Sequence, residues 1–309
     1  MKKIKALITL LLAVGLTTSV YAGGGGSSSK PLDGSYPIVL SHGLLGWGED
    51  SGGIINITEY WGGMDDYLRS QGVAVYAPTK AAAGSNESRA AELKSKILYW
   101  MAANNYSKVH LFGHSQGGLD TRYMISNLGM SSKVRTLTTI SSPHRGSPIA
   151  DLVEGLLPDS LEQYVAGALE LVVGLIYGSS EQDAMAAMNS LTTSGMSAFN
   201  SYTPNASGVK YFSYTSHMTL PDLIQHPLMG ALQIPCGLGG QIVGLGYNND
   251  GLVNVNSAKW GTYKGEPSWS WYITGLDHLQ IVNALYSGQA LFDVEGFFLG
   301  MAQNAKNNQ

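Results

Sequence analysis

Residues 109–118, VHLFGHSQGG, constrain the fold of this chain more than any other stretch. An alternating apolar pattern typical of a strand runs into the sequence Gly-x-Ser-x-Gly, and a helical pattern continues to residue 128. A turn this tight leaves no room for side chains at Gly113 and Gly117. The pattern predicts that Ser115 is exposed at the end of a parallel strand, in front of a helix N-terminus. The alternative is an ordinary surface serine in a glycine-rich loop, which the flanking strand and helix patterns disfavour.

Strand and helix patterns alternate through the first two thirds of the chain. The expected strands are 36–40, 73–77, 108–112, 134–140 and 209–215, with expected helices at 61–70 and 86–103 between them. Further along, 269–273 alternates like a strand and a helix is expected from 280 to 286. Alternating strands and helices joined by short loops predict a mostly parallel α/β sheet.

The first 22 residues have the pattern of a secretory signal peptide, with a basic start, an apolar run and Val20-Tyr21-Ala22 at the end. Residues 23–34 begin rich in glycine and serine and are expected to form a flexible linker. The remaining residues, 35–309, can form one domain with a substantial core. We therefore expect a secreted protein that reaches the medium through the periplasm.

The composition narrows the class of protein further. Cys236 is the one cysteine, so the chain can form no internal disulfide, and we expect a small buried apolar side chain there. The net charge is −4 and no basic run is present, which argues against nucleic acid as a partner. Only 13 % of residues are charged and 44 % are hydrophobic, which indicates that some apolar surface is exposed and has a functional role. We expect a monomer.

A helical, apolar segment interrupts the alternation at about 148–195. Its apolar stripe is wide, and glycines and a proline divide it. One interpretation is a movable lid that covers the site and opens at a lipid surface. The alternative is a buried helical insertion, and the lack of a charged face between 163 and 178 favours the lid.

A serine hydroxyl becomes a good nucleophile only when a base takes its proton, and histidine is suited to that role. In this architecture the order along the chain is serine, acid, histidine. The histidines far enough beyond Ser115 are His217, His226 and His278. His278 follows the last strand-like run and is the predicted base, whereas His114 and His144 are expected to form structural hydrogen bonds.

The acid must hold the imidazole in one tautomer and stabilise its charge. Asp250 lies in a turn before an apolar pair and is the predicted acid. Asp222 and Asp277 are the alternatives, although Asp277 adjoins His278 and adjacent side chains rarely face each other. Acyl transfer develops negative charge on an oxygen, which two backbone N–H groups, the oxyanion hole, must stabilise. We predict that the N–H groups of Leu44 and Gln116 form this oxyanion hole.

Six colinear motifs resemble the bacterial triacylglycerol lipases of the true-lipase family found in Pseudomonas and Proteus. They are Tyr36–Gly46, Ser85–Arg89, Val109–Gly118, Pro143–Ser147, Asn249–Val253 and Asp277–Asn283. The resemblance implies an α/β-hydrolase fold, a Ser115–Asp250–His278 triad, an oxyanion hole at Leu44 and Gln116, and a lid. It therefore agrees with the choice made from the residues themselves.

The chain departs from this family's pattern at the expected structural calcium site. The resemblance implies an aspartate two residues after the histidine, where this chain has Gln280, and a second one near His226-Pro227. Calcium prefers several carboxylate or carbonyl oxygens, so a tight site is not expected here, although carbonyls and water could still hold a weak structural calcium. Some members of the family also carry one disulfide, and some need a dedicated membrane-tethered folding chaperone, which makes such a chaperone a candidate partner.

The predicted function is that of a secreted serine hydrolase that cleaves lipid esters through an acyl-enzyme, with no cofactor in the chemistry. An alternative is an esterase or polyester hydrolase that acts on shorter or polymeric esters with the same triad. A third alternative, from another class, is a surface-binding protein without catalytic activity, which the intact Ser115, Asp250 and His278 argue against.

Overall fold

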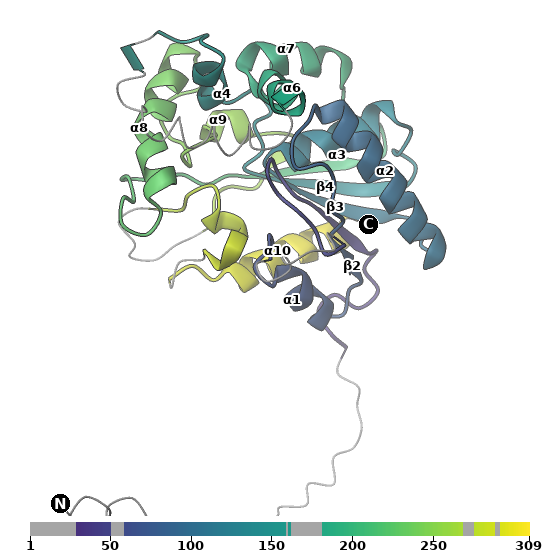
Figure 1. Cartoon of the computed structure of the whole chain (residues 1–309). Coiled ribbons are helices and arrows are strands. Elements are labelled where there is room, and N and C mark those ends of the chain that lie inside the picture. Colours follow the sequence, from purple (N-terminus) through teal and green to yellow (C-terminus); the bar gives the residue numbers. More distant parts are fainter. Residues whose placement is uncertain (1–28, 51–58, 159, 162–180, 268–274, 288–290) are drawn as a thin grey trace, which may run out of the picture.

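The centre of the protein is a parallel β-sheet (Figure 1). The computed structural model describes residues 29–50, 59–158, 160–161, 181–267, 275–287 and 291–309. Within them the strand order is β2-β1-β3-β4-β5-β6, and every neighbouring pair is parallel. The strands are β1 (Ile38–Ser41), β2 (Val75–Tyr76), β3 (Val109–His114), β4 (Val134–Ile140), β5 (Lys210–Tyr214) and β6 (Thr262–Tyr263). The predicted parallel α/β sheet is confirmed, although β6 was not predicted and the strand expected at 269–273 lies outside the described residues.

Helices cover both faces of the sheet (Figure 1). Alternate residues of β1 point to opposite faces: Ile38 and Leu40 join the core with α1 (Met64–Ser70) and α10 (Val294–Lys306), whereas Val39 joins the core with α2 (Asn86–Ala103) and α3 (Gln116–Asn127). These strand residues are fully buried on both faces, which explains why the strands are short continuous apolar runs.

Helix α2 shows how a local pattern produces an element. Ser85 caps its N-terminus by accepting a hydrogen bond from the Ser88 N–H at 3.2 Å. Its apolar residues recur at helical spacing and are buried against the sheet: Ala90, Leu93, Ile97 and Met101. Burial of each larger side chain contributes roughly 1.5–3 kcal/mol. The helix predicted over 86–103 is therefore confirmed at both ends.

A second group of helices lies beside the carboxyl ends of the strands (Figure 1). They are α4 (Pro148–Val153), α6 (Glu181–Leu191), α7 (Thr193–Tyr202), α8 (Pro227–Ile242) and α9 (Val255–Ala258). Ile149 and Leu152 of α4 pack with Leu232 and Cys236 of α8 in one apolar cluster. The Cys236 thiol is free and fully buried, and burial raises its pKa. α4 and α6 belong to the segment expected to form a lid, whose middle part at 162–180 lies outside the described residues.

The segment expected to form a helix at 280–286 is instead two single turns of 3₁₀ helix, η3 (Gln280–Val282) and η4 (Ala284–Tyr286). Asn283, Leu285 and Tyr286 adopt left-handed backbone conformations, which an α-helix cannot accommodate. The expected helix was therefore wrong. Across the described part of the chain, none of the helices combines the length and the apolar character needed to cross a bilayer.

Candidate active site

Ser115 occupies the sharp turn between β3 and α3. Its backbone has φ 55° and ψ −132°, a conformation that costs a non-glycine residue of order 1–3 kcal/mol. The Ser115 N–H donates to the Ile140 carbonyl of β4 at 3.0 Å, so the neighbouring strand helps to hold the turn. The strain lifts the side chain out of the strand at the carboxyl edge of the sheet, where parallel α/β folds bind their ligands.

The two glycines that flank Ser115 make this turn sterically feasible. A Cβ on Gly117 would lie 2.1 Å from the Ser41 carbonyl oxygen of β1, and one on Gly113 would lie 2.6 Å from the Gly118 Cα. Both clashes are with backbone atoms, which cannot rotate away. The glycines thus allow α3 to approach the sheet closely directly behind Ser115.

Asp250 and His278 come together although 27 residues separate them in the chain. His278 Nδ1 and Asp250 Oδ2 are 2.8 Å apart, and the His278 N–H donates to the Asp250 carbonyl at 2.9 Å. Asp250 Oδ1 accepts the N–H groups of Leu252 and Val253, which orients the carboxylate. Because a carboxylate oxygen accepts the bond, Nδ1 carries the proton and Nε2 of the neutral ring is left as an acceptor.

Ser115 and His278 line the same cavity, which has a volume of about 310 Å³. Its remaining wall is almost entirely apolar and comes mainly from the helices beside the sheet and from the loop after β1: Leu44, Leu45, Ile149, Met188, Leu191, Leu228, Met229, Leu252 and Leu279. Asp250 lies behind His278 and is buried. The arrangement therefore places the Ser115 hydroxyl and an imidazole oriented by Asp250 at one cavity, whose wall suits an apolar group.

The loop after β1 lies directly against Ser115. A Cβ on Gly43 would fall 2.7 Å from the Ser115 Cβ, so the two backbones approach as closely as glycine allows. The Gly43 carbonyl accepts a hydrogen bond from Arg89 at 3.0 Å. The peptide between Gly43 and Leu44 is trans, so fixing its carbonyl on Arg89 turns the Leu44 N–H to the opposite side. Gln116 is the first residue of α3, and its N–H belongs to the donors that a helix leaves without an internal partner.

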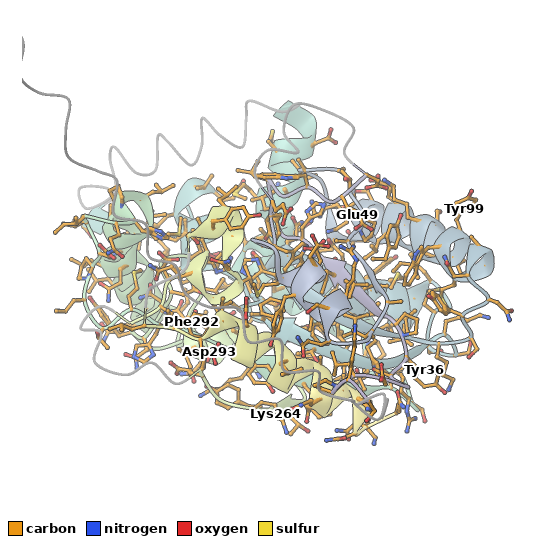
Figure 2. All side chains as sticks on the ribbon, turned by 90° about the horizontal axis from the view of Figure 1, so that it is seen from below. Tyr36, Glu49, Tyr99, Lys264, Phe292 and Asp293 are labelled. Carbon is orange, nitrogen blue, oxygen red and sulfur yellow. The ribbon has the colours of Figure 1, made fainter. Side chains whose placement is uncertain are left out.

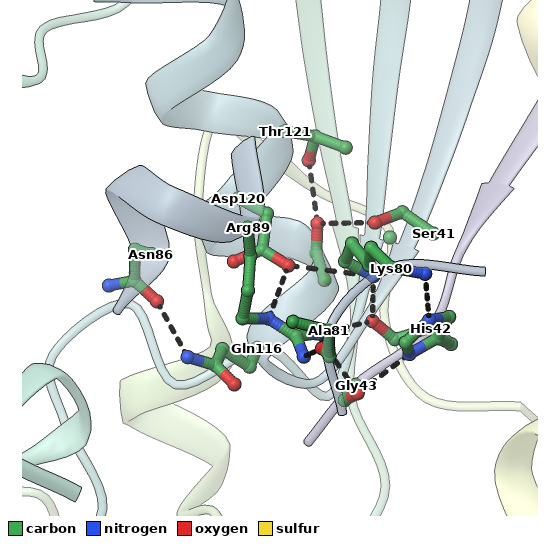
Figure 3. A network of polar contacts seen from close by, with 12 residues as sticks. Ser41, His42, Gly43, Lys80, Ala81, Asn86, Arg89, Gln116, Asp120 and Thr121 are labelled. Carbon is green, nitrogen blue, oxygen red and sulfur yellow. Dashed lines mark hydrogen bonds and ion pairs between the residues drawn. The ribbon is translucent and has the colours of Figure 1, made fainter. Parts of the chain in front are cut away.

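A buried charged cluster supports this loop (Figure 3). Arg89 Nε and Lys80 Nζ contact Asp120 Oδ2 at 3.0 and 3.5 Å, and the three side chains are fully buried. Lys80 and Arg89 also donate to the His42 carbonyl at 2.5 and 3.0 Å. Lys80 and Arg89 have more donors than the Asp120 carboxylate can accept, and the loop carbonyls accept donors that remain.

A chain of hydrogen bonds joins the loop after β1 to the loop that holds His278. The His114 Nε2 lies 2.9 Å from the His278 carbonyl, which can only accept, so Nε2 carries the proton. His114 Nδ1 is then an acceptor for the Tyr60 hydroxyl at 2.6 Å, and the Tyr60 oxygen accepts the Gly43 N–H at 2.9 Å. Burial and the neighbouring His278 hold the pKa of His114 well below its usual value, which keeps the ring neutral. We call this chain the Tyr60–His114 link.

The other candidates from the sequence have different partners. His217 pairs with Glu266, and His226 pairs with Asp277. Asp222 Oδ1 accepts the N–H groups of residues 224 and 225, which makes it a turn-forming residue. His144 lies 3.0 Å from the Thr139 hydroxyl beside β4. Of the alternatives weighed for base and acid, the structure brings only Asp250 and His278 together at the cavity.

The region where the family resemblance implies a structural calcium does not fit a tight site for the ion. Asp277 Oδ1 accepts the N–H groups of Leu279 and Gln280, and its Oδ2 is paired with His226. The Gln280 side-chain oxygen accepts the Asp277 N–H at 3.0 Å. The residues that the structure describes contain no group of three or more His, Cys, Asp or Glu side chains that could hold a metal. The oxygens nearest His278 are thus already bound by protein groups.

Several residues of the site were not predicted from the sequence. Lys80 is the only Asp, Glu, Lys or Arg between Arg69 and Glu87, a signal that it is paired in the interior, whereas Asp120 has Arg122 two residues away and gives no such signal. Arg89 lies in one of the motifs quoted above but was given no role. Nothing local distinguishes Tyr60, because its two partners come from distant parts of the chain.

Comparison with known proteins places the chain in a family. The family profile described as alpha/beta hydrolase fold matches residues 36–207. A triacylglycerol lipase of Vibrio cholerae is 31% identical over 320 residues, which cover 96% of this chain and 95% of that protein. The chain belongs to the bacterial triacylglycerol lipases of the α/β-hydrolase superfamily. A triacylglycerol lipase of Pseudomonas fragi is also similar, with 28% identity over 82% of this chain and 89% of its own length.

Solved structures show the same fold in more distant lipases. The mature form of a Bacillus licheniformis lipase has a TM-score of 0.60 at 21% identity, covering 90% of this chain and 97% of its own. The Staphylococcus hyicus lipase has a TM-score of 0.61 at 20% identity, over 88% and 95% of the two chains. The expected α/β-hydrolase fold is confirmed, with a parallel sheet covered by helices on both faces.

Proposed function

We propose that this protein is a triacylglycerol lipase in which Ser115, His278 and Asp250 form the catalytic triad. The hydrogen bond between His278 and Asp250, beside the same cavity as the strained Ser115, is the observation that carries the proposal. The full-length similarity to the Vibrio cholerae lipase supports the substrate class.

The proposed reaction uses these groups in turn. The Ser115 oxygen attacks the ester carbonyl carbon while His278 Nε2 takes the hydroxyl proton, and Asp250 stabilises the resulting imidazolium. The N–H groups of Leu44 and Gln116 bind the tetrahedral oxyanion. His278 then protonates the leaving alcohol, which departs and leaves an acyl group on Ser115. Water, deprotonated by His278, attacks the acyl-enzyme, and His278 then returns the proton to the Ser115 oxygen as the fatty acid leaves.

Replacing the nucleophile tests the proposal. We expect Ser115→Ala to fold normally and to hydrolyse esters about 10⁵-fold or more slowly, because the residues of a triad act as a unit. A fluorophosphonate probe should label the unmodified chain and leave this variant unlabelled. Ser201→Ala, which removes an exposed hydroxyl on α7, is the matched control and should keep full activity and labelling. Retained hydrolysis in Ser115→Ala would refute the triad.

The apolar wall of the cavity favours lipid esters over short or polymeric ones. Turnover of emulsified long-chain triglyceride should rise sharply above the solubility limit of the substrate, relative to a soluble short-chain ester. Equal rates per active site on the two substrates, or faster release from a polyester film, would favour the esterase or polyester hydrolase instead.

We further infer the maturation and organisation of the chain from its sequence. Residues 1–22 act as a signal peptide, 23–34 as a linker and 35–309 as a monomeric catalytic domain secreted through the periplasm. The segment at about 148–195 serves as the lid, and a membrane-tethered chaperone of the kind that some members of the family need would act before release. Mass spectrometry of the exported protein should find Gly23 as the first residue.

A further inference from the structure

His226 and Asp277 connect the wall of the cavity to the catalytic base proposed above. They are 51 residues apart in the chain, and His226 Nδ1 contacts Asp277 Oδ2. His226 directly precedes α8, whose Leu228 and Met229 line the cavity. Asp277 directly precedes His278. A contact between the two side chains therefore joins the start of α8 to the loop that carries the base.

Asp277 holds the backbone on both sides of His278. Its Oδ1 accepts the N–H groups of Leu279 and Gln280, each at 2.8 Å, and its own N–H donates to the Gln280 side-chain oxygen at 3.0 Å. The Asp277 side chain is 1% exposed, so its second oxygen needs a donor from the protein. Among the residues that the structure describes, His226 is the one basic side chain paired with it. The orientation of this carboxylate, and with it the backbone around His278, is therefore tied to His226.

His226 is itself held in a fixed place. Its carbonyl accepts the Gly230 N–H in the first turn of α8 at 2.9 Å. Asp222 Oδ1 ties the turn before it by accepting the N–H groups of residues 224 and 225. A Cβ on Gly230 would lie 2.4 Å from the Asp222 carbonyl oxygen, so the helix starts in close contact with this turn. The imidazole therefore approaches Asp277 from a rigid support.

The chemistry of the pair differs from that of a metal bridge. A carboxylate only accepts, so His226 Nδ1 carries the proton that it shares with Asp277 Oδ2. The family resemblance implies calcium-binding aspartates at position 280 and near residues 226–227. In this chain the Gln280 oxygen accepts a backbone N–H instead, and residue 226 is a donor. A donor thus faces an acceptor where two carboxylates would need a cation between them.

We propose that His226 is a positioning residue for His278 and takes the place of a bridging metal ion between α8 and the loop of the base. The inference rests on the proposed function, because it concerns the base of that reaction. The pair fixes the backbone of residues 277–280, and the His278 imidazole thereby keeps its bond to Asp250 and its place beside Ser115.

Removing the imidazole tests the positioning role. We expect His226→Ala to lower kcat on a soluble short-chain ester about 10- to 100-fold and to change KM less than about threefold, because small displacements of reacting groups are costly. In His226→Asn the amide nitrogen can take the place of Nδ1 and donate to Asp277, so this variant should recover most of the lost kcat. Steady-state kinetics measures the split. An unchanged kcat in His226→Ala, or an equal loss in both variants, would overturn the proposal.

His217→Ala is the matched control. His217 also pairs through Nδ1 with a carboxylate, that of Glu266, and the side chains of His217 and His226 are 20% and 16% exposed. Neither His217 nor Glu266 is among the described residues that line the cavity. The control should lower the thermal unfolding midpoint and leave kcat unchanged, and an equal fall of kcat would overturn the proposal. Tyr99→Ser, 78% exposed on α2 and far from Phe292 in Figure 2, should change neither quantity.

A second variant tests whether the imidazole stands in for a metal ion. His226→Asp sets a carboxylate against Asp277, and like charges repel unless a cation lies between them. In EDTA we expect this variant to lose kcat as His226→Ala does, and millimolar calcium should restore most of it and raise the thermal unfolding midpoint. Calcium should restore nothing in His226→Ala. A kcat of the unmodified chain that falls in EDTA, or a His226→Asp variant that does not respond to calcium, would contradict the inference.

The unfolding midpoint separates this inference from the proposed function, because it is measured without substrate. If the chain proves inactive on esters, the proposed function fails, and a midpoint that calcium raises in His226→Asp and not in His226→Ala still supports the pair as a substitute for the metal. If Ser115→Ala loses ester hydrolysis while His226→Ala keeps its kcat, the proposed function stands and His226 does not position the base.

Discussion

At the scale of single residues, the Tyr60–His114 link is the least expected part of the site. Every donor in it has one compatible acceptor, because the chain of bonds begins at a backbone N–H and ends at a backbone carbonyl. It connects Gly43, one residue before Leu44, to the backbone of His278. The groups proposed to bind the oxyanion and to move the proton are thereby held at a fixed separation.

Removing the Tyr60 hydroxyl should therefore impair catalysis more than binding. We expect Tyr60→Phe to lower kcat about 10- to 100-fold and to change KM less than about threefold, because small displacements of reacting groups are costly. Steady-state kinetics on a soluble ester measures the split.

Tyr211→Phe provides the comparison for this variant. The Tyr211 hydroxyl also accepts a backbone N–H, from Ala206 at 2.9 Å, and the side chain is buried away from the cavity. Both variants should lose about 1–3 kcal/mol of unfolding free energy. If the role of Tyr60 were purely structural, Tyr60→Phe and Tyr211→Phe would both keep the kcat of the unmodified chain.

At the scale of elements, the approach of α3 to β1 sets the position of Ser115. We expect Gly117→Ala to abolish most activity and to destabilise the fold by at least about 1–3 kcal/mol, since its Cβ would meet the Ser41 carbonyl. Urea unfolding and ester hydrolysis measure the two effects.

Gly300→Ala in α10 is the counterpart in another helix. A Cβ at Gly300 would have nothing within 4 Å, so alanine should stabilise the protein by about 0.4–1 kcal/mol and leave activity intact. If Gly117→Ala behaved like Gly300→Ala, close packing of α3 could not be what positions Ser115.

Elements with a strong local pattern could be predicted from the sequence, and others could not. α2 has a cap and a clear apolar period, and β4 was predicted with its observed limits. α8 escaped prediction because Pro235 and several glycines interrupt it, and it forms by packing against α4. β6 has two exposed residues and exists only through pairing with β5.

Some residues of the candidate site could likewise be predicted from the sequence, and others could not. Ser115 was predicted from a local motif. His278 and Asp250 were predicted from chain order together with their places after strand-like runs, with Asp222 and Asp277 left as alternatives for the acid. The support given by Tyr60, Lys80 and Asp120 depends on contacts across the fold. Apart from the isolated charge of Lys80, such contacts have no local signature, and the absence of an aspartate at Gln280 did not reveal the pairing of Asp277 with His226.

At the scale of the whole molecule, buried neutral histidines tie stability to pH. Burial lowers the pKa of His110 to about 4, against 6.5 in an unfolded chain. Between these values the unfolded chain binds a proton that the folded chain does not, so stability present above pH 6.5 is lost as the pH falls. His110 alone should contribute a loss of about 2 kcal/mol between pH 7 and pH 5.

His110→Gln isolates this contribution. The free energy of unfolding in urea should fall by about 2 kcal/mol less in the variant than in the unmodified chain over the same pH range. The comparison cancels the opposite effect of His226, whose pKa is raised mainly by its hydrogen bond with Asp277. Parallel pH profiles in the two proteins would contradict the assignment of a neutral, buried His110.

The rate at which α4 and α8 separate can be measured through the reactivity of Cys236. Because the chain has one cysteine and it is enclosed by that contact, an alkylating reagent reacts only after these helices separate. As the reagent concentration rises, the labelling rate of Cys236 therefore approaches the rate at which α4 and α8 separate. No engineered probe is needed for this measurement. Repeating the measurement with a covalently acylated Ser115 would report whether an occupied cavity keeps the two helices together.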